Sequence, residues 1–576
     1  MNTTSNGGEI VASFLHGKGV EYIFTLCGGH ISPILIGANN LGIRVVDVRH
    51  EATAVFAADA ITRLSDKPGI STVTAGPGLT NTITAVKNAQ MAQSPIILIG
   101  GATATILKNK GSLQDIDQIA LMKPHVKWTC SVKRTSQIER VLEKCFHIAY
   151  DGVTGPVFIE IPVDLLYPEE IVRKWYGLSS KRNKQRIQQF YLDWHLKKLF
   201  KQRKFQFKPH FSNTPVCPKK HTIKKCIKMI KTAKKPVLLV SSQALLSAKN
   251  APHLKDAIMK IGMPTYLSGL ARGLLGNNFQ NFFLHNRSHS FKEADLVVLA
   301  GAPFDFRLAY GRKIPSNTPI ISINRSFHDL SLNRRPTLAI HADPCLTILK
   351  IAKSWSNKID NWNSWQKKLV NLEIHREKEI IDKSKIKIEK INALALLVKL
   401  NKIIKDDSII IADGGDFVAS ASYIVKPRKT LSWLDPGPFG TLGVGAGFAI
   451  AAKLCRPDAD IWILYGDGSV GYSLAEFDTF YRHNLPVIGL VGNDAGWTQI
   501  KREQVNIFKD DLATTLSNTD YHIAAEGYGG KGVLLNSLDN FEKVVNEIYS
   551  IANSGHPVLL NAIIGETDFR EGSISI

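Results

Sequence analysis

The sequence predicts an α/β protein made of three doubly wound parallel-sheet domains. Short apolar strands alternate with helical segments, the alternation recurs in three successive stretches, and glycine-rich turns follow several of the strands. Strands joined by helices of this length form βαβ units, which give parallel sheets with helices on both faces. At 576 residues the chain is also too long for one hydrophobic core, which favours about three to four domains.

The three stretches are residues 5–170, 221–355 and 395–566. In the first, helices are expected at 10–17, 51–64 and 79–90, and strands at 22–26, 44–48, 69–74, 96–100 and 157–161. In the second, strands are expected at 236–240, 295–300 and 319–323; in the third, at 408–412, 460–465, 486–491 and 557–562. The remaining segments are a basic insertion at 171–220, a surface helix and linker at 356–394, and a tail at 567–576.

The net charge of +22 is concentrated in one segment. Residues 173–235 contain 20 lysines and arginines but one acid, Asp193, so this segment carries +19 and the rest of the chain about +3. The basicity therefore belongs to the insertion and not to the α/β domains. We interpret the segment as a solvated insertion, with contact to an anionic lipid surface or an acidic ligand as alternatives. No nucleic-acid-binding module surrounds its aromatic residues, so no nucleic-acid partner is expected.

Part of the insertion has a weak amphipathic pattern. The segment FYLDWHLKKLF, residues 190–200, predicts a helix with its apolar residues close to one face: Phe190, Leu192, Trp194, Leu196, Leu199 and Phe200. Packing on the protein's own surface is preferred over membrane contact for this face.

Composition excludes several classes of protein. No stretch of about 18 or more uncharged apolar residues is present, and the start MNTTSNGGEI lacks the basic-then-apolar layout of a secretory signal. The seven cysteines form no CxxC pair, so neither a disulfide framework nor a zinc site is suggested. A reducing compartment or a cytosol-facing surface fits this pattern.

The third stretch contains the strongest candidate site. The strand at 460–465 is followed by Gly466-Asp467-Gly468-Ser469, and the strand at 486–491 by Asn493-Asp494-Ala495-Gly496-Trp497. Two parallel strands joined by one helix place both loops at the carboxyl edge of the sheet, where open α/β sheets bind ligands. Acidic and amide oxygens there can hold a hard divalent cation, and glycines let a diphosphate approach the backbone. A lone GDG is more often a turn, but GDG followed by such a pair is a stronger signal.

Three other groups of residues could line a site. Gly440-Thr441-Leu442-Gly443 precedes the glycine-rich helix GVGAGFAIAA, whose small residues also permit close helix packing. Glu51 lies between an expected strand and a helix, a position that acids favour for electrostatic reasons alone. The loops of the first stretch contribute Gly28, Gly29, His30, Gly76, Pro77, Asn81 and Gln114.

Together and in this order, these motifs resemble those of thiamine-diphosphate-dependent enzymes. In that family GDG is followed by an Asn-Asn pair; here the pair is Asn493-Asp494, so both residues remain candidate metal ligands. The resemblance covers nearly all of the chain outside the insertion. It implies pyrimidine-binding, middle and diphosphate-binding domains in this order, with thiamine diphosphate and Mg²⁺ as cofactors.

The resemblance also implies residue roles. Asp467, with Asn493 or Asp494 and the Gly496 carbonyl, would bind Mg²⁺. Glu51 would contact the pyrimidine N1′ and promote deprotonation of C2 in the cofactor, which makes it the best catalytic candidate. Gln114 matches an active-site glutamine, and His30 would transfer a proton or position the substrate. Gly440 would bind the 4′-amino group, and Leu442 would hold the cofactor bent. The implied cofactor-binding loops further include Gly28, Gly29, Gly76, Pro77, Asn81, Thr441, Gly466, Gly468, Ser469 and Trp497.

Within the family, the segments GGHISPILIGANNLGIRVVDVRHEATAVFAADA and RHNLPVIGLVGNDAGWTQIKREQV are similar to 2-hydroxyacyl-CoA lyases. That similarity implies cleavage of 2-hydroxyacyl-CoA to a shortened fatty aldehyde and formyl-CoA in fatty-acid α-oxidation. The first alternative is acetolactate synthesis from 2-keto acids. In that branch the middle domain holds a flavin, and GAPFDFR at 301–307, NRRP at 333–336 and Ala342-Asp343 resemble the loops that bind FAD or an adenine nucleotide. The second alternative is a non-catalytic scaffold that binds anionic surfaces through the basic segment.

The resemblance implies at least a homodimer, or a homotetramer, with each active site at a subunit interface. Glu51 can act only if its domain faces the diphosphate-binding domain of another subunit. Relatives of this branch carry an amino-terminal anchor directed to the endoplasmic reticulum. If an anchor is missing from this form, we therefore expect a cytosol-facing protein associated with the membrane of the endoplasmic reticulum. Otherwise we expect a cytoplasmic protein. Peripheral contact with a membrane is a further expected interaction.

Overall fold

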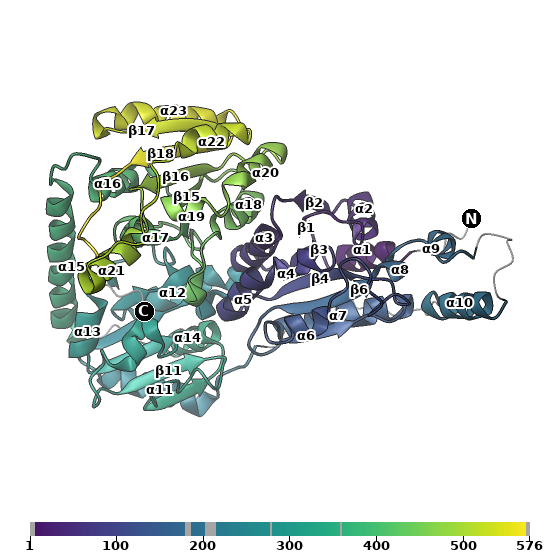
Figure 1. Ribbon diagram of the computed structural model, residues 1–576. Coiled ribbons are helices and arrows are strands. Elements are labelled where there is room, and N and C mark those ends of the chain that lie inside the picture. Colours follow the sequence, from purple (N-terminus) through teal and green to yellow (C-terminus); the bar gives the residue numbers. More distant parts are fainter. Residues whose placement is uncertain (1–5, 179–185, 202–214, 277–278, 357–359, 572–576) are drawn as a thin grey trace. The chain divides into compact units, whose positions relative to one another are not determined.

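The computed structural model describes residues 6–178, 186–201, 215–276, 279–356 and 360–571 (Figure 1). Its contacts divide the chain into two compact units. The first contains the N-terminal domain with the described part of the basic insertion, and the second contains the middle and C-terminal domains. Parts of the predicted basic insertion (179–185 and 202–214), linker (357–359) and tail (572–576) lie outside the described residues.

The first unit is built on a six-stranded parallel sheet with the order β2-β1-β3-β4-β6-β5. Its strands are β1 Tyr22–Thr25, β2 Arg44–Asp47, β3 Gly69–Val73, β4 Ile96–Ala102, β5 Trp128–Ser131 and β6 Val157–Pro162. Its helices are α1 Gly7–Gly17, α2 Ser32–Asn40, α3 Glu51–Leu64, α4 Pro77–Thr80, α5 Ile83–Ala92, α6 Gln118–Met122, α7 Ile138–Tyr150, α8 Val163–Leu166, α9 Glu169–Trp175 and α10 Arg186–Leu199.

The core strands of this sheet are covered on both faces. Every residue of β3, β4 and β6 is buried, which explains why these strands are continuous apolar runs and not alternating ones. Residues of α1, α2 and α7 pack with Ile23, Ile97 and Ile159 in one hydrophobic cluster. The strand β1 pairs with β2 on one side and β3 on the other. The chain therefore reverses its direction of winding between β1 and β3, a point where open α/β sheets bind ligands.

The helix α10 differs from the sequence-based prediction. Phe190, Leu192, Trp194, Leu196, Leu199 and Phe200 were expected close to one face, but only part of this set is buried. Leu196 and Leu199 join the core of the N-terminal domain, whereas Phe190 and Trp194 are exposed. The prediction of a single face was wrong because residues 190 and 194 lie about half a turn away from residues 196 and 199.

The second unit contains two further parallel sheets. The middle-domain sheet has the order β12-β11-β10-β7-β8-β9. Its strands are β7 Pro236–Val240, β8 Thr265–Leu267, β9 Phe282–Phe283, β10 Leu296–Ala300, β11 Ile320–Asn324 and β12 Leu338–His341. Its helices are α11 Lys220–Thr232, α12 Ala251–Ile261, α13 Arg287–Glu293, α14 Pro344–Lys353 and α15 Asn363–Ser384. The long helix α15 buries Trp365 and Leu369 in the core of this domain.

The C-terminal sheet has the order β14-β13-β15-β16-β18-β17. Its strands are β13 Ile409–Asp413, β14 Trp433–Leu434, β15 Ile461–Gly466, β16 Ile488–Asn493, β17 Lys531–Leu535 and β18 Val558–Ile563. Its helices are α16 Ala393–Ile403, α17 Gly415–Ile424, α18 Gly445–Cys455, α19 Asp467–Val470, α20 Phe477–Arg482, α21 Thr498–Phe508, α22 Tyr521–Gly527 and α23 Phe541–Asn553.

Alternate residues of β15 face opposite layers of this domain. Trp462 and Leu464 pack in a cluster with residues of α16, α17 and α23. On the other face, a Cβ added at Gly445 of α18 would lie 2.6 Å from Tyr465 and 2.8 Å from Ile463. The absence of a side chain at Gly445 therefore lets α18 pack directly on the strand.

Short 3₁₀ turns connect these elements. They are η1 Thr135–Gln137, η2 Ser242–Leu245, η3 Ala248–Asn250, η4 Gly269–Ala271, η5 Phe306–Gly311, η6 Asp360–Trp362, η7 Gly437–Phe439, η8 Leu474–Glu476 and η9 Leu538–Asn540.

The predicted fold class is confirmed, since all three sheets are parallel and carry helices. The strands that the sequence did not predict are short or partly exposed. Both β9 and β14 have two residues, and β5, β12 and β17 contain exposed or half-buried positions that interrupt an apolar run. Among the described helices, none combines the length and the apolar character that a membrane span requires.

The central strand β15 provides a test of this packing. Ile463 is fully buried between the sheet and α18. We expect Ile463→Ala to lower the free energy of unfolding of the second unit by about 2–5 kcal/mol, because the truncated side chain leaves a cavity. Urea unfolding followed by tryptophan fluorescence measures this change. Leu534 on β17 is 41% exposed and serves as the control, with an expected change of about 0.5 kcal/mol or less for Leu534→Ala. Equal effects of the two variants would contradict the assigned core.

Candidate active site

A cavity of 270 Å³ lies at the carboxyl edge of the C-terminal sheet. Its walls come from the segments that follow β13, β15 and β16 and from the loop before α18. The strand β13 pairs with β14 on one side and β15 on the other, so the cavity lies where the direction of winding reverses. Nine of the residues predicted for the site line it: Gly440, Leu442, Gly466, Asp467, Gly468, Ser469, Asp494, Gly496 and Trp497.

Two carboxylates meet in this cavity. Asp467 begins α19 directly after β15 and is buried, and its Oδ2 accepts a hydrogen bond of 3.0 Å from the amide of Gly496. Asp494 follows β16, and its Oδ2 accepts a hydrogen bond of 2.6 Å from the Thr498 hydroxyl. The hydrogen bond between Asp467 and Gly496 ties the two loops together. The two loops therefore present two acidic side chains to one cavity.

Burial disfavours the charged forms of both carboxylates, and repulsion by Asp467 adds to this effect at Asp494. Burial raises the pKa of Asp467, although backbone amides, chiefly those of Gly496 and Gly468, oppose the shift. Burial raises the pKa of Asp494 to about 7, with the Thr498 hydrogen bond opposing the shift and the nearby charges of Asp467, Glu566 and Asp416 adding to it. Adjacent carboxylates with raised pKa values are a strong site for a hard divalent cation, because the cation replaces the repulsion by attraction.

The structure separates the two alternatives for the second metal ligand. Asn493 is fully buried, and its Nδ2 donates to the Thr519 carbonyl oxygen at 3.1 Å and to Asn561 Oδ1 at 3.2 Å. Its side chain is thus used to join β16 to β18, while Asp494 lines the cavity. We therefore assign Asp494 as the candidate ligand. Thr441 also does not line the cavity, and its hydroxyl donates to the Leu442 carbonyl oxygen at 3.1 Å.

The floor of the cavity requires residues without side chains. A Cβ added at Gly468 would lie 2.4 Å from the Trp497 ring, and one at Gly414 would lie 2.4 Å from Leu442 Cδ2. Gly414 also has a φ of +75°, which favours glycine. Ser469 donates to the carbonyl oxygens of Asp413 and Gly466, which holds the turn after β15 against β13. The two glycines therefore let Trp497 and Leu442 pack directly against the backbone that lines the cavity.

Sequence reasoning missed the contribution of β13. Asp413, at the end of that strand, is fully buried and accepts hydrogen bonds from the amides of Gly443 at 2.9 Å and Gly445 at 2.7 Å. It thereby positions the loop that carries Leu442. Gly414, Gly415 and Asp416 line the cavity, and Asp416 forms a two-pronged ion pair with Arg502. The available signal was the run Ala-Asp-Gly-Gly-Asp directly after an apolar strand.

In the first unit, the predicted catalytic residue Glu51 lies beside Asn81. Glu51 is 5% exposed at the start of α3, and Asn81 Nδ2 donates to its Oε2 at 2.9 Å. Gly78 lies next to the other oxygen, since a Cβ there would be 3.6 Å from Glu51 Oε1. The loop after β3 therefore orients the carboxyl group and leaves room beside it.

The remaining predicted residues of this unit lie on neighbouring loops. Gly76 has a φ of +63° and precedes Pro77, the first residue of α4; a Cβ there would lie 2.9 Å from Gln114, which itself has a φ of +63°. The amide of Gly76 donates to Gln118 Oε1 at 3.1 Å. The loop after β3 is thus held against the loop that carries Gln114.

The glycine loop after β1 packs against the loop after β3. A Cβ at Gly28 would lie 2.4 Å from the Thr74 Cβ, and the carbonyl oxygen of Gly29 accepts from the Tyr167 hydroxyl at 2.8 Å. His30 Nδ1 lies 3.1 Å from Thr74 Oγ1. Burial lowers the pKa of His30, so the ring is neutral at neutral pH.

The middle-domain loops that resemble a nucleotide site pair their polar groups internally. Arg307 and Asp305 form an ion pair of 2.6 Å, and Arg325 and Asp343 form a buried one of 2.7 Å. Asn333 Nδ2 donates to the Phe304 carbonyl oxygen at 2.8 Å. These contacts stabilise the loops without a nucleotide and supply no specific argument for one.

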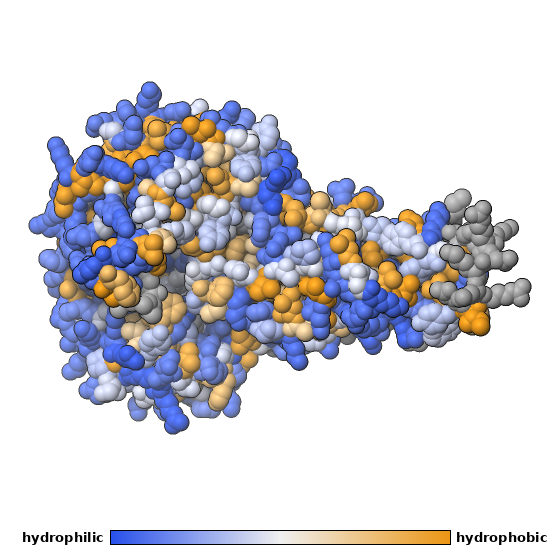
Figure 2. Space-filling model, in the orientation of Figure 1, coloured by the Kyte–Doolittle hydropathy of each residue, from blue (hydrophilic) through white to orange (hydrophobic). Residues whose placement is uncertain are grey.

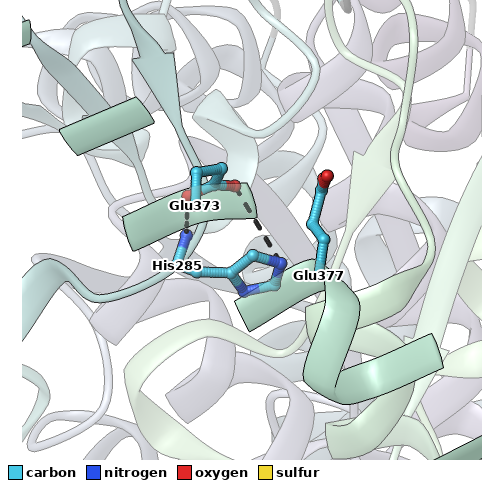
Figure 3. Close-up of side chains that lie close together, drawn as sticks. All are labelled: His285, Glu373 and Glu377. Carbon is cyan, nitrogen blue, oxygen red and sulfur yellow. Dashed lines mark hydrogen bonds and ion pairs between the residues drawn. The ribbon is translucent and has the colours of Figure 1, made fainter. Parts of the chain in front are cut away.

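A second group with metal-binding side chains consists of His285, Glu373 and Glu377 (Figure 3). The two carboxylate oxygens of Glu373 accept hydrogen bonds from the backbone amides of Leu284 at 3.1 Å and His285 at 2.9 Å. The ammonium group of Lys426 donates a hydrogen bond to Glu377. Burial and then the nearby Lys426 charge lower the pKa of His285 to about 4. Because a lysine ammonium already supplies the positive charge, we interpret this group as a polar junction between α15 and its neighbours and not as a metal site.

Comparison with known proteins gives matches over the whole chain. Three family models of thiamine pyrophosphate enzymes match: the N-terminal TPP binding domain at residues 5–121, the central domain at 223–351 and the C-terminal TPP binding domain at 413–562. The protein called 2-hydroxyacyl-CoA lyase 2 from Danio rerio is 48% identical over 99% of this chain and 93% of its own length. Its counterpart from Homo sapiens is 46% identical over 99% of this chain and 92% of its own length. An acetolactate synthase large subunit from Mycobacterium tuberculosis is 27% identical over 97% of this chain and 96% of its own length.

The raised pKa of Asp494 predicts how cation binding depends on pH. A ligand carboxylate must be deprotonated, so protons compete with Mg²⁺ as the pH falls through about 7. We expect Mg²⁺ affinity to weaken by up to about tenfold per pH unit below that value and to level off above it. Isothermal titration calorimetry of the purified chain from about pH 6 to about pH 8 measures this effect.

Asp494→Asn is the matched control for this prediction, because it keeps an oxygen ligand but removes the titrating group. The Asp494→Asn variant should lose most of the pH dependence of Mg²⁺ binding. The separate variant Asp467→Asn should weaken Mg²⁺ binding at every pH. Wild-type affinity that does not change across this pH range would exclude Asp494 as a ligand.

Proposed function

This chain belongs to the thiamine pyrophosphate enzyme family, and from that premise we propose that it is a thiamine-diphosphate-dependent lyase that cleaves 2-hydroxyacyl-CoA to a shortened fatty aldehyde and formyl-CoA. The observation that carries the proposal is the identity of 48% and 46% to proteins named 2-hydroxyacyl-CoA lyase 2 over 99% of the chain. The alternative of a non-catalytic scaffold is set aside, because the match includes all three domains and both groups of site residues.

The residues of the C-terminal cavity fit a diphosphate with a divalent cation. Asp467 and Asp494 would hold Mg²⁺, and the backbone of the GDG turn, which lines the cavity, would face the phosphates. When bound, thiamine diphosphate supplies a carbon nucleophile that adds to carbonyl groups and stabilises the negative charge left by bond cleavage. Asp413 accepts hydrogen bonds from the loop that carries Leu442. Leu442 would then support the bound cofactor between the two rings of the cofactor.

The residues of the first unit supply proton chemistry and positioning. Glu51 would hold a proton at a carboxyl oxygen facing the pyrimidine, while Asn81 occupies the other oxygen and fixes the plane of the group. His30 is held by Thr74 and is neutral at neutral pH, so it can donate or accept a hydrogen bond from the substrate without an ionic charge. Gln114 lies beside Gly76 and would contact the substrate's polar groups.

We also propose that the working enzyme is a homodimer or a larger homo-oligomer. The family places the pyrimidine-binding and diphosphate-binding residues of one active site on two different subunits. In this chain that arrangement would bring Glu51 of one protomer to the Asp467 loop of its partner. A homo-oligomer with a two-fold axis would form two such sites.

The second candidate is acetolactate synthesis from 2-keto acids. It is favoured by the 27% identity to a Mycobacterium tuberculosis acetolactate synthase large subunit over almost the whole chain. This identity is much lower than that to the lyases. The self-paired loops of the middle domain also add no support for a flavin.

The two candidates predict different products. Incubation of the purified chain with Mg²⁺, thiamine diphosphate and 2-hydroxyacyl-CoA should yield formyl-CoA and an aldehyde one carbon shorter, detected by mass spectrometry. Incubation with pyruvate should yield little or no acetolactate, and the purified protein should lack flavin absorbance. Acetolactate as the main product would overturn the lyase proposal.

Glu51→Gln tests the assigned acid. We expect product formation to fall by about 10²–10⁴-fold, because an amide cannot hold and release the proton at the pyrimidine. Steady-state kinetics with a saturating cofactor concentration measures the loss. Glu21→Gln changes an exposed glutamate of the same unit and should retain full activity. A Glu51→Gln enzyme as active as Glu21→Gln would remove Glu51 from the mechanism.

A further inference from the structure

The helix α10 presents apolar residues on two opposite faces. Leu196 is fully buried and Leu199 is 4% exposed, and both pack in the core of the N-terminal domain. The opposite face holds large apolar and aromatic side chains at a spacing of three, one and three residues, and these are exposed: Ile187 (85%), Phe190 (75%), Tyr191 (55%) and Trp194 (51%). This spacing places them on a single stripe of the helix. Packing within its own domain therefore accounts for only one of the two apolar faces of α10.

Several specific contacts fix the orientation of α10. The carbonyl oxygen of Leu199 accepts a hydrogen bond of 3.0 Å from Thr135, and Asp193 forms an ion pair of 2.7 Å with Arg173 of α9. His195 Nε2 lies 2.9 Å from the Thr105 hydroxyl, which donates to the buried Asp164 at 2.6 Å. The aromatic stripe therefore faces outward because the opposite side of the helix is attached, and not because the helix is loosely placed.

The exposed stripe is flanked by positive charge. Lys198 lies 5.0 Å from the ring centre of Trp194, and Lys197, whose side chain is 70% exposed, pairs with Asp193 at 2.8 Å. Residues 173–235 as a whole carry +19. Figure 2 shows a small hydrophobic area among hydrophilic residues at the position that α10 occupies in Figure 1. Apolar rings beside lysines are the combination that binds at the interface of an anionic membrane, where the rings enter the headgroup layer and the ammonium groups meet the lipid phosphates.

We propose that the outer stripe of α10 (Ile187, Phe190, Tyr191 and Trp194) with Lys197 and Lys198 is a docking surface for an anionic lipid bilayer. The proposal is independent of the catalytic reaction and needs no membrane-spanning helix. It assigns to the basic insertion a function beyond catalysis: holding the N-terminal domain at a membrane surface.

Charge decides between a bilayer and a second copy of the chain. A two-fold contact through this stripe would place each strongly basic segment against its own copy, and like charges at such a contact are destabilising. An anionic bilayer instead complements the charge and accepts the aromatic rings. Nucleic acid would also complement the charge, but the stripe includes the exposed aliphatic Ile187, which has no base-stacking function.

Vesicle flotation of the full chain tests the proposal. The protein should float with phosphatidylcholine vesicles that contain phosphatidylserine and should stay in solution with vesicles of phosphatidylcholine alone. Raised salt should weaken binding, because the lysine contribution is screened. The double variant Phe190→Ser with Trp194→Ser should lower the vesicle affinity by at least about tenfold, since it removes the rings that enter the interface.

Two further variants separate the proposed surface from general effects. Phe327→Ser removes an aromatic side chain that is 77% exposed in the middle domain and should bind vesicles as the wild type does. Lys197→Gln with Lys198→Gln should lower the affinity and reduce its salt dependence. Circular dichroism and thermal unfolding should be unchanged in all variants, because the altered side chains lie mainly in solvent.

Several outcomes would overturn the proposal. One is a wild-type chain that does not float with phosphatidylserine vesicles. Another is equal flotation of the Phe190/Trp194 double variant and the wild type. A third is a stripe variant that binds vesicles normally but loses concentration-dependent self-association in sedimentation, which would make the stripe a protein interface. A fourth is a wild-type chain that binds a single-stranded RNA probe but no vesicles, together with loss of the RNA binding in the stripe variant. That result would make the stripe a nucleic-acid surface.

Discussion

The candidate active site depends on two carboxylates placed at the ends of adjacent parallel strands. Asp467 follows β15 and Asp494 follows β16; burial raises both pKa values, and the charge of Asp467 adds to the shift at Asp494. Such a pair costs folding free energy unless a cation or protons neutralise it. The structure accepts that cost at a point where the sheet changes its direction of winding. The pair is therefore better explained by ligand binding than by stability.

The rest of the cavity supports this pair. Asp416 and Arg502 form a nearly buried ion pair close to the carboxylates, and Asp413 fixes the loop that carries Leu442. Glycines occur where side chains would collide, as at Gly468 against Trp497. In the first unit Asn81 has the same supporting relation to Glu51. In both units, neighbouring side chains hold the site residues that lie at the carboxyl edge of a parallel sheet. Efficient sites need such supporting contacts to fix the orientation of their functional groups.

The basic insertion carries apolar surface that its own domain covers only in part. Its helix α10 satisfies one face with Leu196 and Leu199 in the domain core and leaves the aromatic face in water. A helix that had only to pack on its own domain would carry polar residues on that outer face. The lysines beside the rings explain why an anionic partner fits this surface better than a neutral one.

The amino-acid sequence by itself determined the fold class, the order of the three domains, the family and nine of the residues that line the C-terminal cavity. These features depend on local signals: buried parallel strands are continuous apolar runs, and glycine-rich turns follow them. Tertiary structure alone decided what depends on where a side chain points. It placed Asn493 against β18 and Asp494 in the cavity, added Asp413 and Asp416 to the site, and decided which apolar face of α10 is buried. Neighbouring residues at the end of a strand point in opposite directions, and which face of a helix is buried depends on the packing available to it. Neither choice can be read from residue types without the surrounding sheet.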